Sequence, residues 1–250
     1  MTNTIKGVVS LGASLLRPTR GLIAVGHRKQ PKKTLVLYEA EYCPYCRYVR
    51  EALTALDLDA LIYPIPKKGS RFKEQLIATG GKAQVPFLVD PNTGAKLHES
   101  EAIVKHLYQE YGPKDAKIPT LGIKSSLNAT LLRGGKGMFA KPGTTPKKPL
   151  ELYSFEASPY ARLVRETLCE LELPFLLHNV GKAPGKLGEW LPPELRHKRG
   201  YTPETKNRKL LAERGGKVMI PYLVDPNTKT AMYESGDIQR YLRTTYGPNN

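Results

Sequence analysis

Residues 35–51 read LVLYEAEYCPYCRYVRE, and residues 150–166 read LELYSFEASPYARLVRE. The two runs agree at most positions, and Cys43 aligns with Ser158. Each run begins with alternating apolar residues and continues with apolar residues at helical spacing, which predicts a strand followed by a helix. The same strand, short motif and helix therefore occur twice in this chain.

The repetition continues along the rest of the chain. The segments GGK, LVDPNT, ES and YGP occur at residues 80–82, 88–93, 99–100 and 111–113, and again at residues 215–217, 223–228, 234–235 and 246–248. The second copy is longer than the first between residues 181 and 214.

The amino-terminal segment belongs to the repeat as well. Residues 11–17 match residues 127–133, and a glycine follows each segment, at Gly21 and at Gly137. A cleaved transit peptide would have no reason to recur inside the chain. We therefore expect a lead-in helix at residues 5–16, a first domain at residues 1–116 and a second domain, with its lead-in linker, at residues 117–250.

The first copy predicts alternating strands and helices. Strands are expected at residues 35–39, 61–65, 85–89 and 95–98, and helices at residues 43–58, 70–79 and 99–111. Ser70 is a candidate N-cap for the middle helix. The resulting order, β-α-β-α-β-β-α, is typical of a thioredoxin-like α/β domain.

The net charge and the hydropathy of the sequence indicate which kinds of molecule the protein can bind. The chain has 39 Lys and Arg residues against 23 Asp and Glu residues, and its net charge of +16 favours anionic partners. It contains no recognition-helix, aromatic-strand or zinc-finger motif, so we expect no nucleic-acid partner. Its apolar stretches are far shorter than the roughly 20 residues that cross a bilayer, so we expect no transmembrane span.

Two of the three cysteines, Cys43 and Cys46, form a C-x-x-C pair. In a reducing compartment such a pair indicates redox chemistry, and it supplies too few ligands for a closed zinc site. We therefore expect a cytoplasmic protein without a metal site. Cys43 stands just before a helix, where free N–H groups stabilise a thiolate, and Cys46 can resolve a mixed disulfide. Cys169 is expected to be buried and inert.

The run CPYC at residues 43–46 resembles the dithiol motif of glutaredoxins. Val85-Pro86 with Glu99-Ser100 resembles the glutathione-binding half of glutathione transferases. The resemblance spans both copies, and an all-helical carboxyl-terminal domain is missing, as in the transferase class that has two N-terminal-type domains. It implies an α/β fold of two tandem thioredoxin-like domains that use glutathione.

The resemblance also implies which residues bind glutathione. Pro86 would be a cis proline, and the backbone of Val85 would pair with the cysteinyl part of glutathione. Glu99 and Ser100 would hold the γ-glutamyl group. Tyr45 completes the set in the first copy, and the corresponding residues in the second copy are Tyr160, Ile220, Pro221, Glu234 and Ser235.

In the second copy Ser158 and Ala161 replace the two cysteines, so this copy cannot exchange disulfides. Ser158 resembles the hydroxyl of serine-type glutathione transferases, which donates a hydrogen bond to the glutathione thiolate. The longer segment at residues 181–214 contains Trp190 and the basic run at 196–199. We expect it to be a solvated surface loop; the alternative is that it lines a pocket.

The leading hypothesis is a glutathione-dependent thiol–disulfide oxidoreductase. Cys43 would attack a small-molecule or protein disulfide, and Cys46 or glutathione would resolve the intermediate. One alternative is a glutathione transferase or peroxidase that uses Ser158. Another is a non-catalytic protein that binds glutathione, a hydrophobic ligand or an iron–sulfur cluster.

Overall fold

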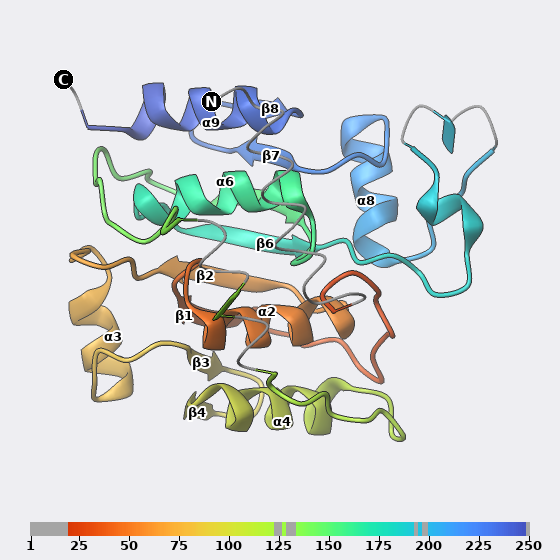
Figure 1. The fold of residues 1–250 in the computed structure, drawn as a ribbon, viewed down its shortest axis with the longest axis horizontal. Coiled ribbons are helices and arrows are strands. Elements are labelled where there is room, and N and C mark those ends of the chain that lie inside the picture. Colours follow the sequence, from red (N-terminus) through yellow and green to blue (C-terminus); the bar gives the residue numbers. More distant parts are fainter. Residues whose placement is uncertain (1–19, 123–126, 129–133, 193–194, 197–199, 249–250) are drawn as a thin grey trace.

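The computed structural model describes residues 20–122, 127–128, 134–192, 195–196 and 200–248 (Figure 1). The lead-in helix predicted at residues 5–16 lies outside this part of the chain. The first copy contains strands β1 (Leu35–Glu39), β2 (Ala60–Pro64), β3 (Phe87–Asp90) and β4 (Ala95–His98), and helices α2 (Pro44–Ala55), α3 (Lys73–Gly80) and α4 (Ser100–Tyr111). The second copy contains strands β5 (Leu150–Ser154), β6 (Phe175–Asn179), β7 (Tyr222–Asp225) and β8 (Thr230–Met232), helices α6 (Pro159–Glu170), α8 (Lys206–Gly215) and α9 (Ser235–Tyr246), and the 3₁₀ helix η1 (Leu187–Trp190).

Both copies have the predicted order of strands and helices. In each, the first two strands are parallel and the third is antiparallel to the first. The α/β fold of two thioredoxin-like units is thus confirmed. The N-cap prediction for Ser70 is wrong, because α3 begins at Lys73 and Phe72 occupies the N-cap position without a side-chain bond. The carbonyl of Ser70 instead accepts a hydrogen bond from the Lys73 N–H, in the turn before the helix.

The two copies share one sheet. Strands β2 and β6 pair antiparallel and join the copies into an eight-stranded sheet of order β4-β3-β1-β2-β6-β5-β7-β8 (Figure 1). Leu61 lies opposite Leu176, its own counterpart in the repeat, while Ala60 faces Leu177 and Ile62 faces Phe175. This register is symmetric about its central pair, so an approximate two-fold axis relates the copies.

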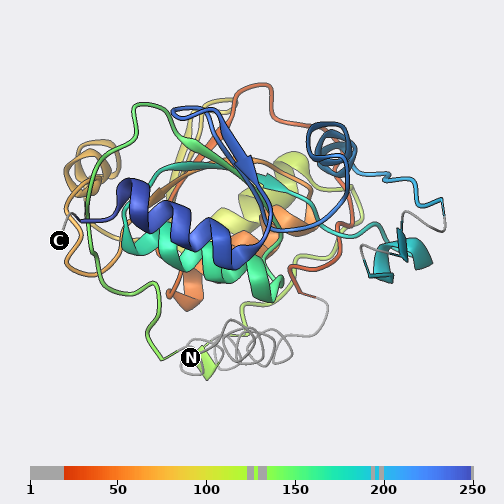
Figure 2. The ribbon, with the colours of Figure 1, turned by 90° about the horizontal axis from the view of Figure 1, so that it is seen from above.

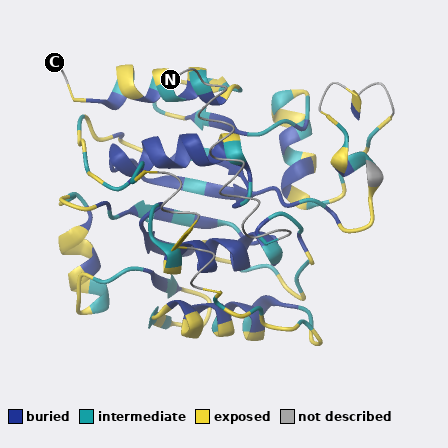
Figure 3. Ribbon diagram, viewed as in Figure 1, coloured by how far each residue is buried: buried dark blue, intermediate teal, exposed yellow. Residues whose placement is uncertain are grey.

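The hydrophobic core is also continuous across the repeat. One buried cluster includes Leu35 and Leu53 of the first copy together with Leu152 and Leu168 of the second. Helices α2 and α6 are almost entirely buried, whereas α3, α4, α8 and α9 each show an exposed face (Figure 3). Helices α3 and α8 lie at opposite sides of the molecule (Figures 1 and 2). Among the described residues, no helix has the length and apolarity that a membrane span requires.

The repeated DPNT and YGP segments have a structural role. Asp90, at the end of β3, accepts a hydrogen bond from the hydroxyl of Tyr111 (2.6 Å) and lies 2.9 Å from Nε2 of His106. The corresponding contacts in the second copy join Asp225 to Tyr246 and Tyr241. These carboxylates therefore fix the last helix of each copy to the preceding hairpin.

The glycines that follow the two lead-in segments pass close to the motif regions. Gly21 and Gly137 both have positive φ, 64° and 75°. A Cβ atom on Gly21 would lie 2.6 Å from Cβ of Glu156, and one on Gly137 would lie 3.2 Å from Cα of Glu166. The close approach and the left-handed backbone both require glycine at these positions.

Candidate functional site

Sheet topology brings the predicted site residues of each copy to one edge. In the first copy, β1 ends shortly before Cys43, which precedes α2. Strand β3 is antiparallel to β1 and begins just after Pro86, and β4 ends just before Glu99 and Ser100. The motif, the proline and the Glu-Ser pair therefore meet at the same end of the sheet.

The backbone at both sites has the same unusual features. The Val85–Pro86 and Ile220–Pro221 peptide bonds are both cis, as predicted. Glu99 and Glu234, which precede the last helices, have φ values of 67° and 66°. Residues other than glycine rarely adopt positive φ, and such strained positions concentrate at ligand sites.

The two cysteines of the first copy differ in access. Cys43 is the N-cap residue of α2, and its Sγ accepts a hydrogen bond from the backbone N–H of Cys46 at 3.4 Å. Cys43 is partly exposed, whereas Cys46 is fully buried. The Sγ of Cys46 accepts a hydrogen bond from the N–H of Ala40 at 3.5 Å. An incoming disulfide can therefore reach Cys43 and not Cys46.

The two thiols also differ in acidity. The hydrogen bond from the Cys46 thiol, assisted by the backbone N–H groups of Cys46 and Tyr45, lowers the pKa of Cys43 to about 7. Burial, together with the neighbouring Cys43, raises the pKa of Cys46 well above its ordinary value. The lowered pKa favours the thiolate of Cys43, which is the reactive form of cysteine.

The acidity of Cys43 leads to a pH prediction. Alkylation of Cys43 by iodoacetamide should increase with pH through a midpoint near 7, because the thiolate is the nucleophile. Cys46→Ala removes the thiol donor and should move the midpoint toward the ordinary cysteine pKa of about 8.5. Peptide mapping by mass spectrometry gives the rate at each site, and the buried Cys46 and Cys169 should stay unmodified in the folded protein. A wild-type midpoint above pH 8 would contradict the expectation.

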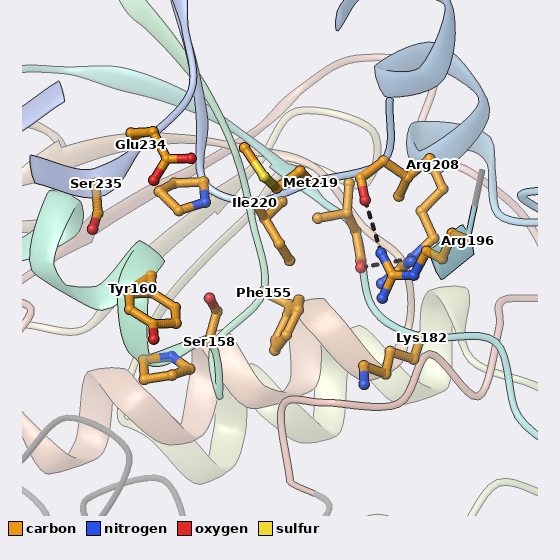
Figure 4. A pocket seen from close by; sticks show the side chains of 14 residues that line it. Phe155, Ser158, Tyr160, Lys182, Arg196, Arg208, Met219, Ile220, Glu234 and Ser235 are labelled. Atoms are coloured by element: carbon orange, nitrogen blue, oxygen red, sulfur yellow. Dashed lines mark hydrogen bonds between the residues drawn. The ribbon is translucent and has the colours of Figure 1, made fainter. Parts of the chain in front are cut away.

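The second copy contains a cavity of about 440 Å³ at its site (Figure 4). Ser158 is the N-cap residue of α6, as Cys43 is of α2, and its Oγ accepts a hydrogen bond from the N–H of Ala161 at 3.2 Å. The cavity is lined by every residue that the sequence predicts for the site of this copy: Ser158, Tyr160, Ile220, Pro221, Glu234 and Ser235.

Comparison with known proteins identifies the family. The family model described as glutathione S-transferase, N-terminal domain, matches residues 37–115 and again residues 152–250. The chain belongs to this family. A comparison with curated proteins found no match. Two solved structures are similar in part. A delta-class glutathione transferase of Nilaparvata lugens is 21% identical with a TM-score of 0.28, over 54% of this chain and 78% of that one. A trimeric glutathione transferase of Leishmania is 12% identical with a TM-score of 0.29, over 87% of this chain and 68% of that one.

Each matched glutathione transferase segment contains one motif, one cis proline and one Glu-Ser pair. The same unusual backbone therefore occurs once in each segment that matches the family model. The described residues form the two sheet-based units and contain no all-helical domain.

The cavity is also lined by residues outside the predicted glutathione-binding motifs. Its walls include Phe155, Val180, Val218 and Met219, and one end is formed by Lys182, Arg196 and Arg208. The expectation of a solvated loop at residues 181–214 is wrong for Lys182, Arg196 and Arg208, which fit the alternative that this segment lines a pocket. A basic segment has the same composition on a surface and beside a cavity, so no local signal could have distinguished them.

The two glutathione transferase units differ at the residue before the Val-Pro or Ile-Pro pair. In the first, Nε2 of Gln84 donates a hydrogen bond to the carboxylate of Glu99 at 2.7 Å. In the second, Met219 aligns with Gln84 and lines the cavity. Met219 cannot donate such a bond to Glu234, so the two Glu-Ser pairs have different polar surroundings.

Buried charges connect the two motif loops. Glu41 lies in the loop before the first motif and accepts hydrogen bonds from Nε and Nη2 of Arg165, at 3.0 and 3.1 Å. Glu156, its counterpart before the second motif, accepts one from Nε of Arg50 at 2.7 Å. Each motif loop is thus held by an arginine from the other copy.

These four residues and three further ones form a group of buried charges, which we call the inter-copy charge cluster. Its members, each at most 3% exposed, are Glu39, Glu41, Arg47, Arg50, Glu156, Arg162 and Arg165. Burial, outweighing the attraction of Arg50, raises the pKa of Glu39 to about 7. Burial acts in the same direction on Glu156, but the surrounding arginines outweigh it and hold the pKa of that carboxyl far below its ordinary range. Buried charges of this kind depend on their mutual pairing.

Proposed function

We propose that the protein is a glutathione-dependent thiol–disulfide oxidoreductase in which Cys43 is the nucleophile and Cys46 the resolving thiol. The difference in exposure and in pKa between the two thiols supports the proposal. Cys43 is accessible and has a pKa of about 7, whereas Cys46 is buried behind it with a raised pKa. This is the division of roles that a dithiol reductant needs.

The proposed reaction proceeds through a mixed disulfide. The Cys43 thiolate attacks the glutathione sulfur of a glutathionylated substrate, a new S–S bond forms, and the substrate leaves as its thiolate. A second glutathione thiolate then attacks the bond on Cys43 and releases glutathione disulfide. In the dithiol route the Cys46 thiolate attacks Sγ of Cys43 instead, the bond to glutathione breaks, and glutathione leaves as its thiolate. Two glutathione molecules then reduce the Cys43–Cys46 disulfide and form glutathione disulfide. The Val85 backbone, Glu99 and Ser100 would hold the glutathione moiety at this edge of the sheet.

Reduction of the mixed disulfide of cysteine and glutathione tests the proposal. With glutathione as reductant, the protein should form glutathione disulfide well above the uncatalysed rate. A rate equal to that of a sample without protein would contradict the oxidoreductase function.

The cavity supports a second candidate function, a transferase or peroxidase reaction of glutathione bound at Ser158. Because Oγ of Ser158 accepts the Ala161 N–H, the hydroxyl proton remains available for the glutathione sulfur. Such a bond favours the thiolate and lowers the pKa of bound glutathione.

We expect Ser158→Ala to raise the pKa of bound glutathione by about one unit, the scale of a single charge-assisted hydrogen bond. Thiolate absorbance of the glutathione complex as a function of pH measures the shift, in a Cys43→Ala background that removes the reactive thiol of the first copy. Ser70→Ala, an exposed change in the first copy, is the control. The same pKa in both variants would argue against the role of Ser158.

A further inference from the structure

Residues 20–26 precede the first copy in the sequence, but their backbone pairs with the second copy. The N–H of Ala24 donates a hydrogen bond to the carbonyl of Lys182 at 2.9 Å, and the carbonyl of Leu22 accepts the N–H of Lys182 at 2.8 Å. Lys182 lies shortly after β6 of the second copy. We call residues 20–26 the crossing segment.

The second lead-in crosses to the first copy in the same way. The N–H of Ala140 donates to the carbonyl of Lys67 at 2.9 Å, and the carbonyl of Met138 accepts the N–H of Lys67 at 2.7 Å. Lys67 lies shortly after β2, as its counterpart Lys182 lies after β6. The same contacts occur at two places in the chain, so the crossing is a feature of the repeat.

The crossing segment also contacts the turn that ends in Ser158. The carbonyl of Gly21 accepts a hydrogen bond from the N–H of Ala157 at 2.8 Å, and the N–H of Ser158 donates to the carbonyl of Phe155 at 3.1 Å. Leu22 packs against the apolar cluster that contains Phe155. Because the turn is held on both sides, the crossing segment restricts where Ser158 can lie.

We propose that the crossing segment is a positioning element of the second site, and that it holds Ser158 where its hydroxyl meets glutathione. The inference rests on the proposed glutathione site at Ser158. Ser158 lines the cavity, whereas Gly21 and Leu22 do not, so the segment acts through the turn and not by contact with the ligand. Substitutions in the segment should therefore affect the site of the second copy and not Cys43.

Gly21→Ala disturbs this contact directly. The added Cβ would lie 2.6 Å from Cβ of Glu156, so the turn before Ser158 has to shift. Gly26→Ala is the matched control, because Gly26 also has a positive φ, of 96°, but no described atom lies within 4 Å of the Cβ that it would gain. Leu22→Ala alters the packing against the same turn without this clash, and it replaces Gly21→Ala in the test if that variant does not fold.

The acidity of a thiol at position 158 reports its placement without requiring glutathione. Ser158→Cys puts a thiol at the N-cap of α6, where the N–H of Ala161 and the positive end of the helix lower a thiol pKa below the ordinary value of about 8.5. Alkylation by iodoacetamide at different pH values, followed by peptide mapping, gives the midpoint at this position and at Cys43 in one sample. The charged residues that line the cavity are the same in every variant: Lys182, Arg196, Arg208 and Glu234.

In the Ser158→Cys chain, Gly21→Ala should raise the alkylation midpoint at position 158 by about half a pH unit or more, the scale of one weakened hydrogen bond to a thiolate. Leu22→Ala should raise it by less. The midpoint at Cys43 should stay near 7 in both variants, and Gly26→Ala should change neither midpoint. In a Cys43→Ala chain that keeps Ser158, Gly21→Ala should also raise the pKa of bound glutathione.

The outcomes separate this inference from the glutathione site. Equal shifts at position 158 and at Cys43, or the same shift in Gly26→Ala, would indicate general loosening and overturn the inference. Unchanged midpoints in Gly21→Ala and Leu22→Ala would overturn it as well, and the glutathione site stands if calorimetry shows that the Cys43→Ala protein binds glutathione. If glutathione gives no heat while the midpoint at position 158 depends on Gly21, the glutathione site fails and the positioning by the crossing segment stands.

Discussion

Cys43→Ser is expected to lower the rate of glutathione-linked disulfide reduction by about a thousandfold or more, because a serine hydroxyl is not ionised at neutral pH and does not displace a thiol. Cys46→Ser should keep a substantial rate, since glutathione can itself resolve the mixed disulfide on Cys43. The assay is turnover of the cysteine–glutathione mixed disulfide at equal concentrations of folded protein.

Cys169→Ser is the matched control for this pair, because it also removes one thiol but at a buried position in α6. Its rate should equal that of the wild type. A Cys43→Ser protein with wild-type turnover would assign the reaction to another group. If Cys43→Ser and Cys46→Ser lower the rate of disulfide reduction equally, the protein uses the dithiol route alone.

Glu156→Gln is expected to lower the free energy of unfolding by about 3–5 kcal/mol, the cost of breaking a buried ion pair from one side. The carboxylate lies 2.7 Å from Arg50, 3.0 Å from Arg165 and 3.4 Å from Arg47. Glutamine keeps the shape but leaves the buried guanidinium groups of the inter-copy charge cluster with fewer negative partners. Urea denaturation at neutral pH measures the change.

Glu213→Gln provides the control, since Glu213 is exposed on α8 and its substitution should change stability by no more than about 0.5 kcal/mol. A Glu156→Gln protein as stable as this control would show that the cluster tolerates a missing charge. A lower urea midpoint with an unchanged slope would show that stability, and not compactness, has changed.

The same substitution should alter the response to acid. The folded pKa of Glu156 lies below the unfolded value of about 4.3, so its stabilisation is complete at neutral pH and is lost as the pH falls below about 4. Glu39 has the opposite effect on stability. Its folded pKa of about 7 lies above the unfolded value of about 4.3, so the folded protein loses stability as the pH rises from about 4 toward 7. Glu156→Gln should therefore lose less stability than the wild type below about pH 4.

Much of the fold could be predicted because its signals are local. Alternating apolar residues at 35–39 and 150–154, and the motif before each helix, depend only on near neighbours in the chain. The six predicted residues that line the cavity of the second copy were found through the resemblance of short motifs that recur in both copies. Ser70 failed as an N-cap because the turn before α3 uses its carbonyl and not its hydroxyl.

The junction between the copies could not be predicted in this way. An apolar strand such as residues 61–65 has the same pattern whether it pairs with another strand or lies under a helix. Arg50 and Arg165 likewise have the sequence pattern of the polar face of a helix, yet both are buried against carboxylates of the other copy. These features depend on partners more than a hundred residues away, so no short window of sequence contains them.

The symmetric pairing of β2 with β6 is the geometry by which two identical subunits form a closed, isologous dimer. In a dimer of identical chains every substitution is present in both sites. In a single chain each substitution affects one site, so the thiol at Cys43 and the hydroxyl at Ser158 can coexist on equivalent scaffolds. Joining the halves covalently therefore keeps the structural benefits of two-fold symmetry while each site is free to specialise.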